Sequence, residues 1–314
     1  MEGVPALSLM LLSLPGAELT PARFTQREVE ALETAPEWRA EAGLSDERVN
    51  GWLLFADPFR IDSEALIGGL ASAYPRKPIV GGLASGDHRA QRTHVFLDDQ
   101  VFSEGAVGLA VGGAIAVKTV VSQGCAPIGE AWTITGVQGN VVETISGRSA
   151  LEVLIETLRG LPPAQQRRAE RNLLVGLAID EYRDTFTRGD FLIRNLTGVD
   201  QESGAIGLNA YPRLGQTIQF QMRDAAAADD DINELLGVTT SELGNQKPVA
   251  AVLCSCNGRG AGLFGAPDHD AAAVAAQLGR LPVAGFFCNG EIGPIGDRIF
   301  LHGFTASIAL LVPA

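Results

Sequence analysis

The chain of 314 residues is poor in the residue types that build disulfide frameworks and metal centres. It contains four cysteines and four histidines, and aromatic residues make up only 6% of it. So few cysteines in a chain of this length are typical of a protein kept in a reducing cytoplasm. Cys254 and Cys256 stand one residue apart, which is not the spacing of a zinc knuckle. We therefore expect a cytoplasmic protein without a structural metal.

Positive charge is also scarce. Lysine and arginine number 24 against 37 aspartates and glutamates, which gives a formal net charge of -13 at pH 7. A surface with this balance repels the phosphate backbone of nucleic acids and anionic membranes. We therefore predict no nucleic-acid partner and no membrane partner. One local arginine can still bind a small anion.

Long hydrophobic runs are missing as well. No segment is long and apolar enough to span a bilayer. Residues 5–14, PALSLMLLSL, form the most apolar stretch, but no Lys or Arg precedes it and no convincing cleavage site follows it. We predict a buried strand there rather than a signal peptide.

Nucleotide-binding fingerprints are absent too. Gly81-Gly82 and Gly112-Gly113 are not followed by the Lys-Ser/Thr pair of a phosphate loop, and the dinucleotide fingerprint does not occur.

The residues that are abundant predict a well-packed core. Hydrophobic residues make up 46% of the chain and charged residues 19%, so two domains or one large duplicated domain can bury a core. Apolar runs that end in turn residues alternate with segments of helical spacing, which predicts β-α-β units followed by antiparallel strands. The predicted fold class is therefore α/β (mixed α+β), with mixed sheets covered by helices. The first such unit comprises the strand 52–58, the helix 61–74 and the strand 79–87. The second comprises the strand 249–259, the helix 268–278 and the strand 283–291.

The two units share a local pattern. Val80–Asp87 and Ala284–Glu291 each pass from an apolar strand into a small polar turn, then glycine, then an acid. At the same offset, residues 94–97 match residues 298–301. We interpret the chain as a pseudo-duplication with segments 1–146 and 147–314, and with its working surface where the two copies meet.

Turns at the carboxyl ends of strands are where open α/β sheets bind ligands. Two such turns in the second unit, 254–260 and 285–294, combine glycines with hydrogen-bonding and charged side chains. The predicted ligand-binding residues are those of these turns and their first-unit counterparts: Cys256, Asn257, Arg259, Asn289, Glu291, Ser85 and Asp87.

Arg259 and Glu291 are expected to face one cleft. A guanidinium can hold a carboxylate through two parallel hydrogen bonds, and a carboxylate suits an ammonium group, so together they suit an amino-acid-like zwitterion. The alternative is that Arg259 and Glu291 pair with each other and join the two loops.

Covalent and cofactor chemistry are weaker alternatives. Cys256 could be a nucleophile if Arg259 depresses its pKa, but His269 and His302 carry no motif of a catalytic base. Cys254 and Cys288 are expected to be small buried side chains. A haem would need a histidine or cysteine in a deep pocket, so no cofactor is predicted.

Several of these stretches together resemble the FIST sensory domain, in its N-terminal and C-terminal halves. They are Val80–Asp87, Gly124–Gly129 with Ser149-Ala150-Leu151, Cys254–Gly260, and Gly285–Pro294 with Phe304-Thr305-Ala306. The resemblance implies an intracellular input module of bacterial signalling that senses small ligands, amino acids among them, without catalysis. It also implies a signalling partner, since no kinase, cyclase or methyl-accepting region is attached.

Three alternatives stay open. Some family members are similar to haem-binding sensors, so a haem-based or redox sensor is one alternative. A hydrolase or transferase using Cys256 is another, and a protein-binding scaffold is the third. Family members usually carry a further upstream portion, so the N-terminal half is expected to be shortened here.

Overall fold

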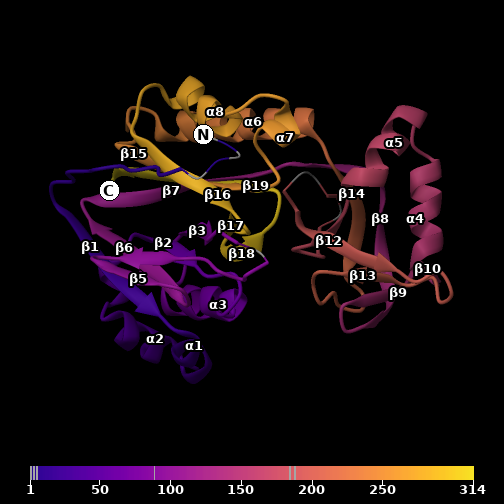
Figure 1. The fold of residues 1–314 in the computed structure, drawn as a ribbon, viewed down its shortest axis with the longest axis horizontal. Helices are drawn as coiled ribbons and strands as arrows, with labels where there is room; N and C mark the ends of the chain where they lie inside the picture. Colours follow the sequence, from indigo (N-terminus) through magenta and orange to yellow (C-terminus); the bar gives the residue numbers. More distant parts are fainter. Residues whose placement is uncertain (1, 3, 5, 88, 184, 187–188) are drawn as a thin grey trace. The chain divides into compact units, whose positions relative to one another are not determined.

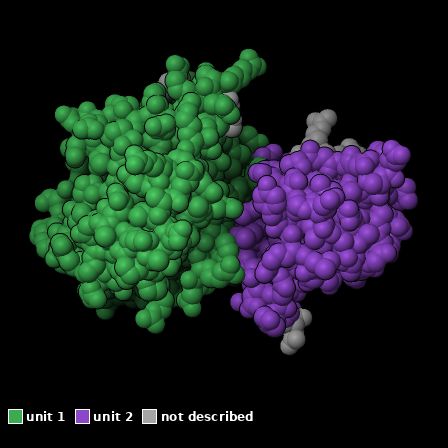
Figure 2. Space-filling view, turned by 90° about the horizontal axis from the view of Figure 1, so that it is seen from below, with its two compact units in different colours: residues 1–122, 230–314 green, residues 123–229 purple. Residues whose placement is uncertain are grey.

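The computed structural model describes residues 2, 4, 6–87, 89–183, 185–186 and 189–314 (Figure 1). The chain divides into two compact units, shown in different colours in Figure 2. Unit 1 comprises residues 1–122 and 230–314, and unit 2 comprises residues 123–229.

Unit 1 contains a six-stranded mixed sheet, which we call the first sheet. β2 and β3 run parallel, and their other neighbours in the sheet are antiparallel. The strand β2, GWLLFA, is nearly all buried, as expected for a strand covered on both faces. The strand order is β1 (Ala17–Phe24), β6 (Ala106–Gly113), β2 (Gly51–Ala56), β3 (Ile79–Leu83), β17 (Glu291–Ile295) and β18 (Arg298–His302).

A second sheet of unit 1 has four strands. In it, β15 runs parallel to β16 on one side and antiparallel to β19 on the other. Its order is β16 (Val283–Cys288), β15 (Ala250–Cys256), β19 (Thr305–Pro313) and β7 (Ile115–Gln123). A separate hairpin is formed by β4 (Val95–Leu97) and β5 (Gln100–Phe102).

Helices cover the outer face of each sheet (Figure 1). The first sheet packs on α1 (Gln26–Ala31), α2 (Ala35–Ala42) and α3 (Ser63–Ala73), with the short helix η1 (Asp46–Arg48) nearby in sequence. The second sheet packs on α6 (Ala225–Leu243) and α8 (His269–Leu278), and α7 (Ala261–Phe264) is a single turn before α8.

A third apolar cluster fills the space between the two sheets. It joins Leu53 and Val80 of the first sheet to Ala250, Ala309 and Leu311 of the second. Unit 1 is therefore a four-layer arrangement of helices, sheet, sheet and helices.

Unit 2 is a closed β-barrel of six strands with two helices. The pairing of β8 with β9 closes the ring, and its core contains Ile134, Val175, Ile206 and Phe220. The ring runs β9 (Val141–Ile145), β13 (Ile206–Leu208), β12 (Phe191–Val199), β11 (Leu173–Ala178), β14 (Thr217–Arg223) and β8 (Cys125–Gln138). The remaining elements of unit 2 are β10 (Arg148–Ser149), α4 (Ala150–Arg159) and α5 (Pro163–Asn172).

The predicted mixed α/β fold is confirmed, but the sequence did not predict the barrel. The compact units also do not coincide with the predicted segments 1–146 and 147–314. The physical reason is that the barrel needs strands from both sides of that boundary. β8 and β9 come before it, and β11 to β14 come after it.

The predicted buried strand at residues 5–14 is wrong over the residues described, 6–14. These residues form no strand, and Leu7, Leu9 and Leu11 are 82%, 74% and 87% exposed. The antiparallel partner of β6 is instead β1, which begins at Ala17. An apolar run needs a strand to pair with and a face to cover, and here β1 already fills that place in the first sheet. Pro5 lies outside the described residues.

The two β-α-β units share the order and direction of their strands. β2, β3 and β6 are arranged as β15, β16 and β19 are. Gly81 and Gly285 occupy equivalent positions, because a Cβ at either would overlap the backbone carbonyl oxygen of the neighbouring strand, at Leu54 and Leu253 respectively.

The hairpins that follow the two units differ. Val95–Leu97 is the first strand of its hairpin, whereas Arg298–His302 is the second strand of a hairpin whose other strand pairs with β3. The predicted match of 94–97 with 298–301 is therefore not reproduced, and the duplication stays a prediction.

Among the residues that the structure describes, none of the helices combines the length and apolar character needed to cross a membrane.

Candidate functional site

The polar turns of the second β-α-β unit meet at one edge of the second sheet. β15 and β16 are parallel and in register from Ala251↔Val283 to Cys256↔Cys288, so both strands end at the same level. Asn257 N–H donates to the carbonyl of Cys288 at 2.9 Å, and the Asn257 side-chain amide donates to Oδ1 of Asn289 at 2.7 Å. The structure thus brings together two of the predicted site residues on the exposed rim of this edge.

The carboxyl end of β3 reaches the same place. Asn289 N–H donates to the carbonyl of Leu83, and its side-chain amide donates to the carbonyl of Ala84, both at 3.0 Å. The site therefore lies where the two sheets of unit 1 approach each other.

Arg259 is paired with Asp270 of α8. Its Nε and Nη2 donate to the two carboxylate oxygens of Asp270 at 2.8 Å each, and the Arg259 side chain is 0% exposed. Burial acts to raise the pKa of Asp270, but the hydrogen bonds and charge of Arg259 outweigh it and hold that pKa below its usual value. The predicted structural ion pair between Arg259 and Glu291 is thus replaced by a bidentate pair with Asp270.

Asp270 was missed by the sequence reasoning. It also accepts a hydrogen bond from the Ser255 hydroxyl at 2.5 Å and lies 3.1 Å from Nδ1 of His269. No sequence motif marks Asp270, and only the general requirement of a buried arginine for an acidic partner could have indicated it. A buried arginine needs an acid, and Asp270 in the first turn of α8 is an acid close to it in sequence.

Glu291 is the first residue of β17 and is fully buried. Its Oε2 accepts a hydrogen bond from Thr305 N–H at 3.2 Å, whereas its Oε1 has no hydrogen-bond partner among the described residues. Burial raises the pKa of Glu291 well above its ordinary value, and the hydrogen bond from Thr305 N–H, the contact with the Cys256 thiol and the charge of Arg259 only partly offset this. The structure therefore favours a neutral, protonated acid at this position.

The thiol of Cys256 lies beside Glu291. Burial is the main cause that raises the pKa of Cys256 to about 12, and the adjacent Glu291 side chain contributes to the same shift. Cys288 also has a raised pKa, caused first by burial and then by Cys254. Cys254 and Cys288 are buried, as predicted. Gly82 of β3 makes room for this packing, since a Cβ there would overlap Sγ of Cys288.

The backbone is strained next to this acid. Phe304 has a φ of 60°, a left-handed conformation that bulky residues rarely adopt. Nη1 of Arg259 lies 3.5 Å from the Phe304 carbonyl, and the following residue, Thr305, donates to Glu291. Such strain is held in place by its surroundings and often occurs at functional sites.

Backbone N–H groups that follow Arg259 bind the carboxylate of Glu2. The two oxygens of Glu2 accept hydrogen bonds from Ala261 N–H at 2.5 Å and Asp268 N–H at 2.9 Å. Gly260, at a φ of 77°, permits the approach, because a Cβ there would lie 2.6 Å from Oε2 of Glu2. Backbone N–H groups arranged in this way form a concavity that suits a carboxylate.

The first-unit counterparts have local roles. Asp87 is exposed, and its Oδ1 accepts from Arg89 N–H and Ala90 N–H at 3.0 Å each. The bond from Ala90 is the main cause that lowers its pKa. Ser85 is exposed and follows Ala84, whose carbonyl contacts Asn289. Of these two, only Ser85 lies next to a residue that touches the rim.

The described histidines near the site are engaged in packing. His269 stacks on Phe264 with ring centroids 3.4 Å apart, and Nε2 of His302 lies 3.0 Å from the carbonyl of Gly293. No cluster of three or more His, Cys, Asp or Glu side chains in the described ranges could hold a metal ion. His88 lies outside the described residues. These contacts give the haem alternative no support.

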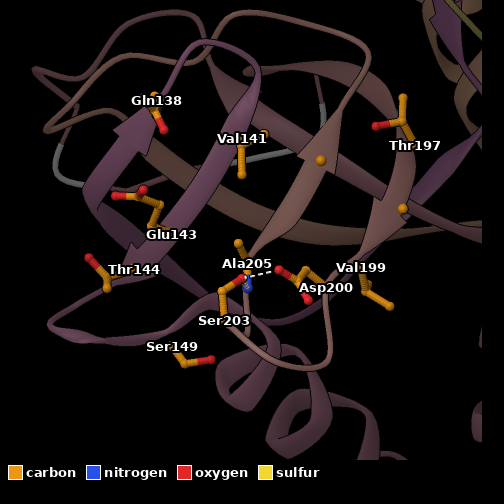
Figure 3. A pocket seen from close by; sticks show the side chains of 12 residues that line it. Gln138, Val141, Glu143, Thr144, Ser149, Thr197, Val199, Asp200, Ser203 and Ala205 are labelled. Carbon is orange, nitrogen blue, oxygen red and sulfur yellow. Dashed lines mark hydrogen bonds between the residues drawn. The ribbon is translucent and has the colours of Figure 1, made fainter.

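Unit 2 has a hollow of about 720 Å³ on its barrel (Figure 3). The carboxylates of Glu143 and Asp200, which line this hollow, are not buried with an unpartnered oxygen as Glu291 is. Glu143 is exposed, and Asp200 accepts hydrogen bonds from the Ser203 hydroxyl at 2.6 Å and from Glu202 N–H at 2.9 Å. None of the predicted site residues lines the hollow. We therefore place the candidate site at the edge of β15 and β16 rather than here.

Comparison with known proteins places this arrangement in a family. The FIST N domain family matches residues 2–148, and the FIST C domain family matches residues 150–294. The chain therefore belongs to the FIST family, whose domains are sensory domains linked to signal transduction.

Two mycobacterial relatives match nearly the whole chain. The uncharacterized protein MT0656 of Mycobacterium tuberculosis (strain CDC 1551 / Oshkosh) is 42% identical over 312 residues. The uncharacterized protein Mb0898c of Mycobacterium bovis (strain ATCC BAA-935 / AF2122/97) is 38% identical over 312 residues. In both cases the match covers 99% of this chain and 79% of the relative.

Proposed function

We propose that this FIST protein is a non-catalytic, cytoplasmic sensory module that binds a small amino-acid-like or carboxylate ligand at the carboxyl ends of β15 and β16. The observation that carries the proposal is Glu291, a fully buried acid whose Oε1 has no partner among the described residues, two positions after Asn289 of the rim. A buried polar atom without a partner costs about 1–3 kcal/mol, so a structure that retains one calls for an explanation such as a ligand.

The rim supplies groups that a ligand can use. The Asn257 side chain is exposed, and its amide currently bonds to Asn289. A polar ligand can replace this hydrogen bond with two of its own, without leaving either amide unsatisfied. The Glu2 carboxylate shows in addition that backbone N–H groups of the neighbouring turn accommodate a carboxylate.

The nucleophiles of the site argue against catalysis. A thiol with a pKa near 12 is almost entirely protonated at neutral pH, and the thiolate is the reactive form. The Ser255 hydroxyl donates a hydrogen bond to Asp270, but Arg259 holds the pKa of that carboxylate below its usual value, so Asp270 is a weak base for activating the hydroxyl. These features disfavour the hydrolase or transferase alternative.

The position of Glu291 suggests how binding is transmitted. The chain leaves β16 of the second sheet and enters β17 at Glu291, which pairs with Gly82 of β3 in the first sheet. A ligand that binds the Glu291 carboxyl therefore acts on the joint between two sheets. A ligand shifts the equilibrium between two conformations of this joint when it binds one of them more tightly. A signalling protein that binds only one conformation would then respond to the ligand.

A thermal-shift screen with amino acids and small carboxylates tests the proposal. A ligand at a hundred times its Kd adds about 2.7 kcal/mol of stability. We expect a shift that is lost in Asn257→Ala and retained in Glu143→Gln, a matched exposed residue of the barrel hollow. A shift lost only in Glu143→Gln would place binding in unit 2 instead. The absence of a shift with every compound would refute a small-ligand sensor.

A further inference from the structure

The charges of the site are unevenly compensated. The positive charge of Arg259 is matched by Asp270 through two hydrogen bonds, and neither side chain is more than 7% exposed. Glu291, by contrast, has one oxygen, Oε1, without a hydrogen-bond partner among the described residues. Once Glu291 is ionised, this oxygen therefore needs a donor, and the described part of the site has no uncompensated cation to offer an anion.

We infer that the ligand is recognised through a primary ammonium group that donates to Oε1 of Glu291, and that its binding displaces the proton of Glu291 to solvent. This inference rests on the proposed function and specifies the part of the ligand that reaches the buried acid.

The proton balance follows from the two partners. The free protein carries a neutral carboxyl at Glu291 and the ligand carries R–NH₃⁺. In the complex the ammonium faces a carboxylate, and one proton is released for each ligand bound. A carboxylate ligand would find no free cation beside Glu291 and could only accept a hydrogen bond from the protonated carboxyl, so its binding would keep Glu291 neutral and release no proton.

The surroundings can stabilise the carboxylate once it forms. Thr305 N–H already donates to Oε2, and a desolvated ion pair is favourable when its geometry is good and its remaining atoms are hydrogen-bonded. The strained Phe304 backbone lies next to Thr305, so this loop has a conformation that ligand binding can relax. The titratable and charged groups that face Glu291 from the packed elements are Cys256 of β15, Cys288 of β16, Arg259 of the following turn, Asp270 of α8 and His302 of β18.

The matched ligands for the test share one carbon skeleton. Leucine carries both groups, 3-methylbutylamine lacks the carboxylate, and 4-methylpentanoate lacks the ammonium. Binding of each to the full chain is measured by isothermal titration calorimetry between pH 6 and 8, where alkyl ammonium groups stay protonated. Repeating one titration in buffers of different ionisation enthalpy counts the protons released.

We expect leucine and 3-methylbutylamine to bind, with an affinity that rises by up to about tenfold per pH unit and with close to one proton released. Glu291→Gln should weaken both by roughly 30-fold or more and abolish the pH dependence, because the amide cannot ionise. Glu143→Gln, an exposed acid of unit 2, should change neither.

The outcomes separate this inference from the proposed function. Binding of 4-methylpentanoate without the amine, or binding of leucine that is independent of pH, would overturn the inference and leave a ligand sensor in place. Binding of none of the three, together with a negative thermal-shift screen, would overturn both. The pH dependence of the unmodified protein decides the matter even if Glu291→Gln fails to fold.

Discussion

The two β-α-β units end in turns of similar sequence, but the acids of these turns differ in their hydrogen bonding. After β2, the buried Asp57 accepts hydrogen bonds from Phe59 N–H and Arg60 N–H, at 2.9 and 2.7 Å, and from the Thr93 hydroxyl. After β3, Asp87 closes its own turn in the same way. After β15 and β16, an arginine is buried with a partner from a helix, and Glu291 keeps an unsatisfied oxygen.

This difference indicates which acids still have an oxygen available for a ligand. An acid whose oxygens are used by donors of its own turn stabilises that turn and has little left to offer. An acid buried without a donor destabilises the free protein unless it is neutral or a ligand arrives. On this comparison we propose that the acids of the first unit stabilise their turns and that the ligand binds at the second.

The most damaging change should be the loss of the Arg259 partner. Asp270→Ala leaves a buried guanidinium uncompensated, and we expect a loss of about 3–5 kcal/mol in the free energy of unfolding. Asp87→Ala is the matched change in the first unit, at an exposed turn, and should have a far smaller effect. Urea denaturation of both variants measures the difference, and equal losses would break the comparison.

Thiol reactivity should be the next largest effect. With a pKa of about 12, Cys256 should react with iodoacetamide at pH 7 about a thousandfold more slowly than free cysteine. Mass-spectrometric mapping of alkylated peptides gives the rate, and the same protein unfolded in urea is the control. A rate equal to or above that of free cysteine would restore the nucleophile alternative.

Alanine substitution should destabilise the protein equally at the two equivalent glycines, Gly81 and Gly285. A Cβ at Gly81 or Gly285 overlaps a carbonyl oxygen of the neighbouring strand, so alanine at either should destabilise by about 1–3 kcal/mol through backbone shifts. Gly139→Ala is a useful control, because nothing lies near its Cβ position, although its φ of 60° makes alanine mildly strained. Unequal losses at Gly81 and Gly285 would weaken the case for equivalent units.

The pH dependence of stability should carry opposite signs from two acids of the same site. Glu291 has a raised pKa in the folded state, so its stabilising contribution is complete below its ordinary value of 4.5 and is lost as the pH rises above it. Asp270 has a lowered pKa, so its contribution is present above 3.8 and is lost as the pH falls.

Comparison of the wild type with Glu291→Gln isolates the first of these terms. Between pH 5 and 8 the wild type should lose stability relative to the variant, by at most about 1.4 kcal/mol per pH unit. The measurement is the urea midpoint at several pH values. A constant difference across that range would mean that Glu291 ionises as an ordinary acid.

Part of this site could be predicted from the sequence. Two parallel strands of one β-α-β unit must end at the same edge of their sheet, which predicts that Cys256, Asn257, Asn289 and Glu291 lie close together. The partner of Arg259 could not be predicted, because the choice between Asp270 and Glu291 depends on the packing of α8 over the sheet.

The fold was predictable to the same degree. The β-α-β units and their helices carry local hydrophobic periodicity, and the structure has them close to their expected ranges. The barrel was not predicted, because its ring joins β8 to β14 and β9 to β13 across pairings distant in sequence, and the β8–β14 pairing has a register shift that no local pattern records. The buried strand predicted for the apolar segment was wrong over residues 6–14 for a related reason. Composition does not indicate whether a partner strand is available.

The most direct test of the account is the protonation state of Glu291 in the free protein. Carbon-13 NMR titration of the side-chain carboxyl groups, with the Glu291 signal assigned by its loss in Glu291→Gln, reports that state without any ligand. The account predicts a carboxyl that is still protonated at neutral pH, with a transition well above that of the exposed glutamates. A Glu291 signal that titrates near 4.5 would show an ordinary carboxylate and would contradict the account.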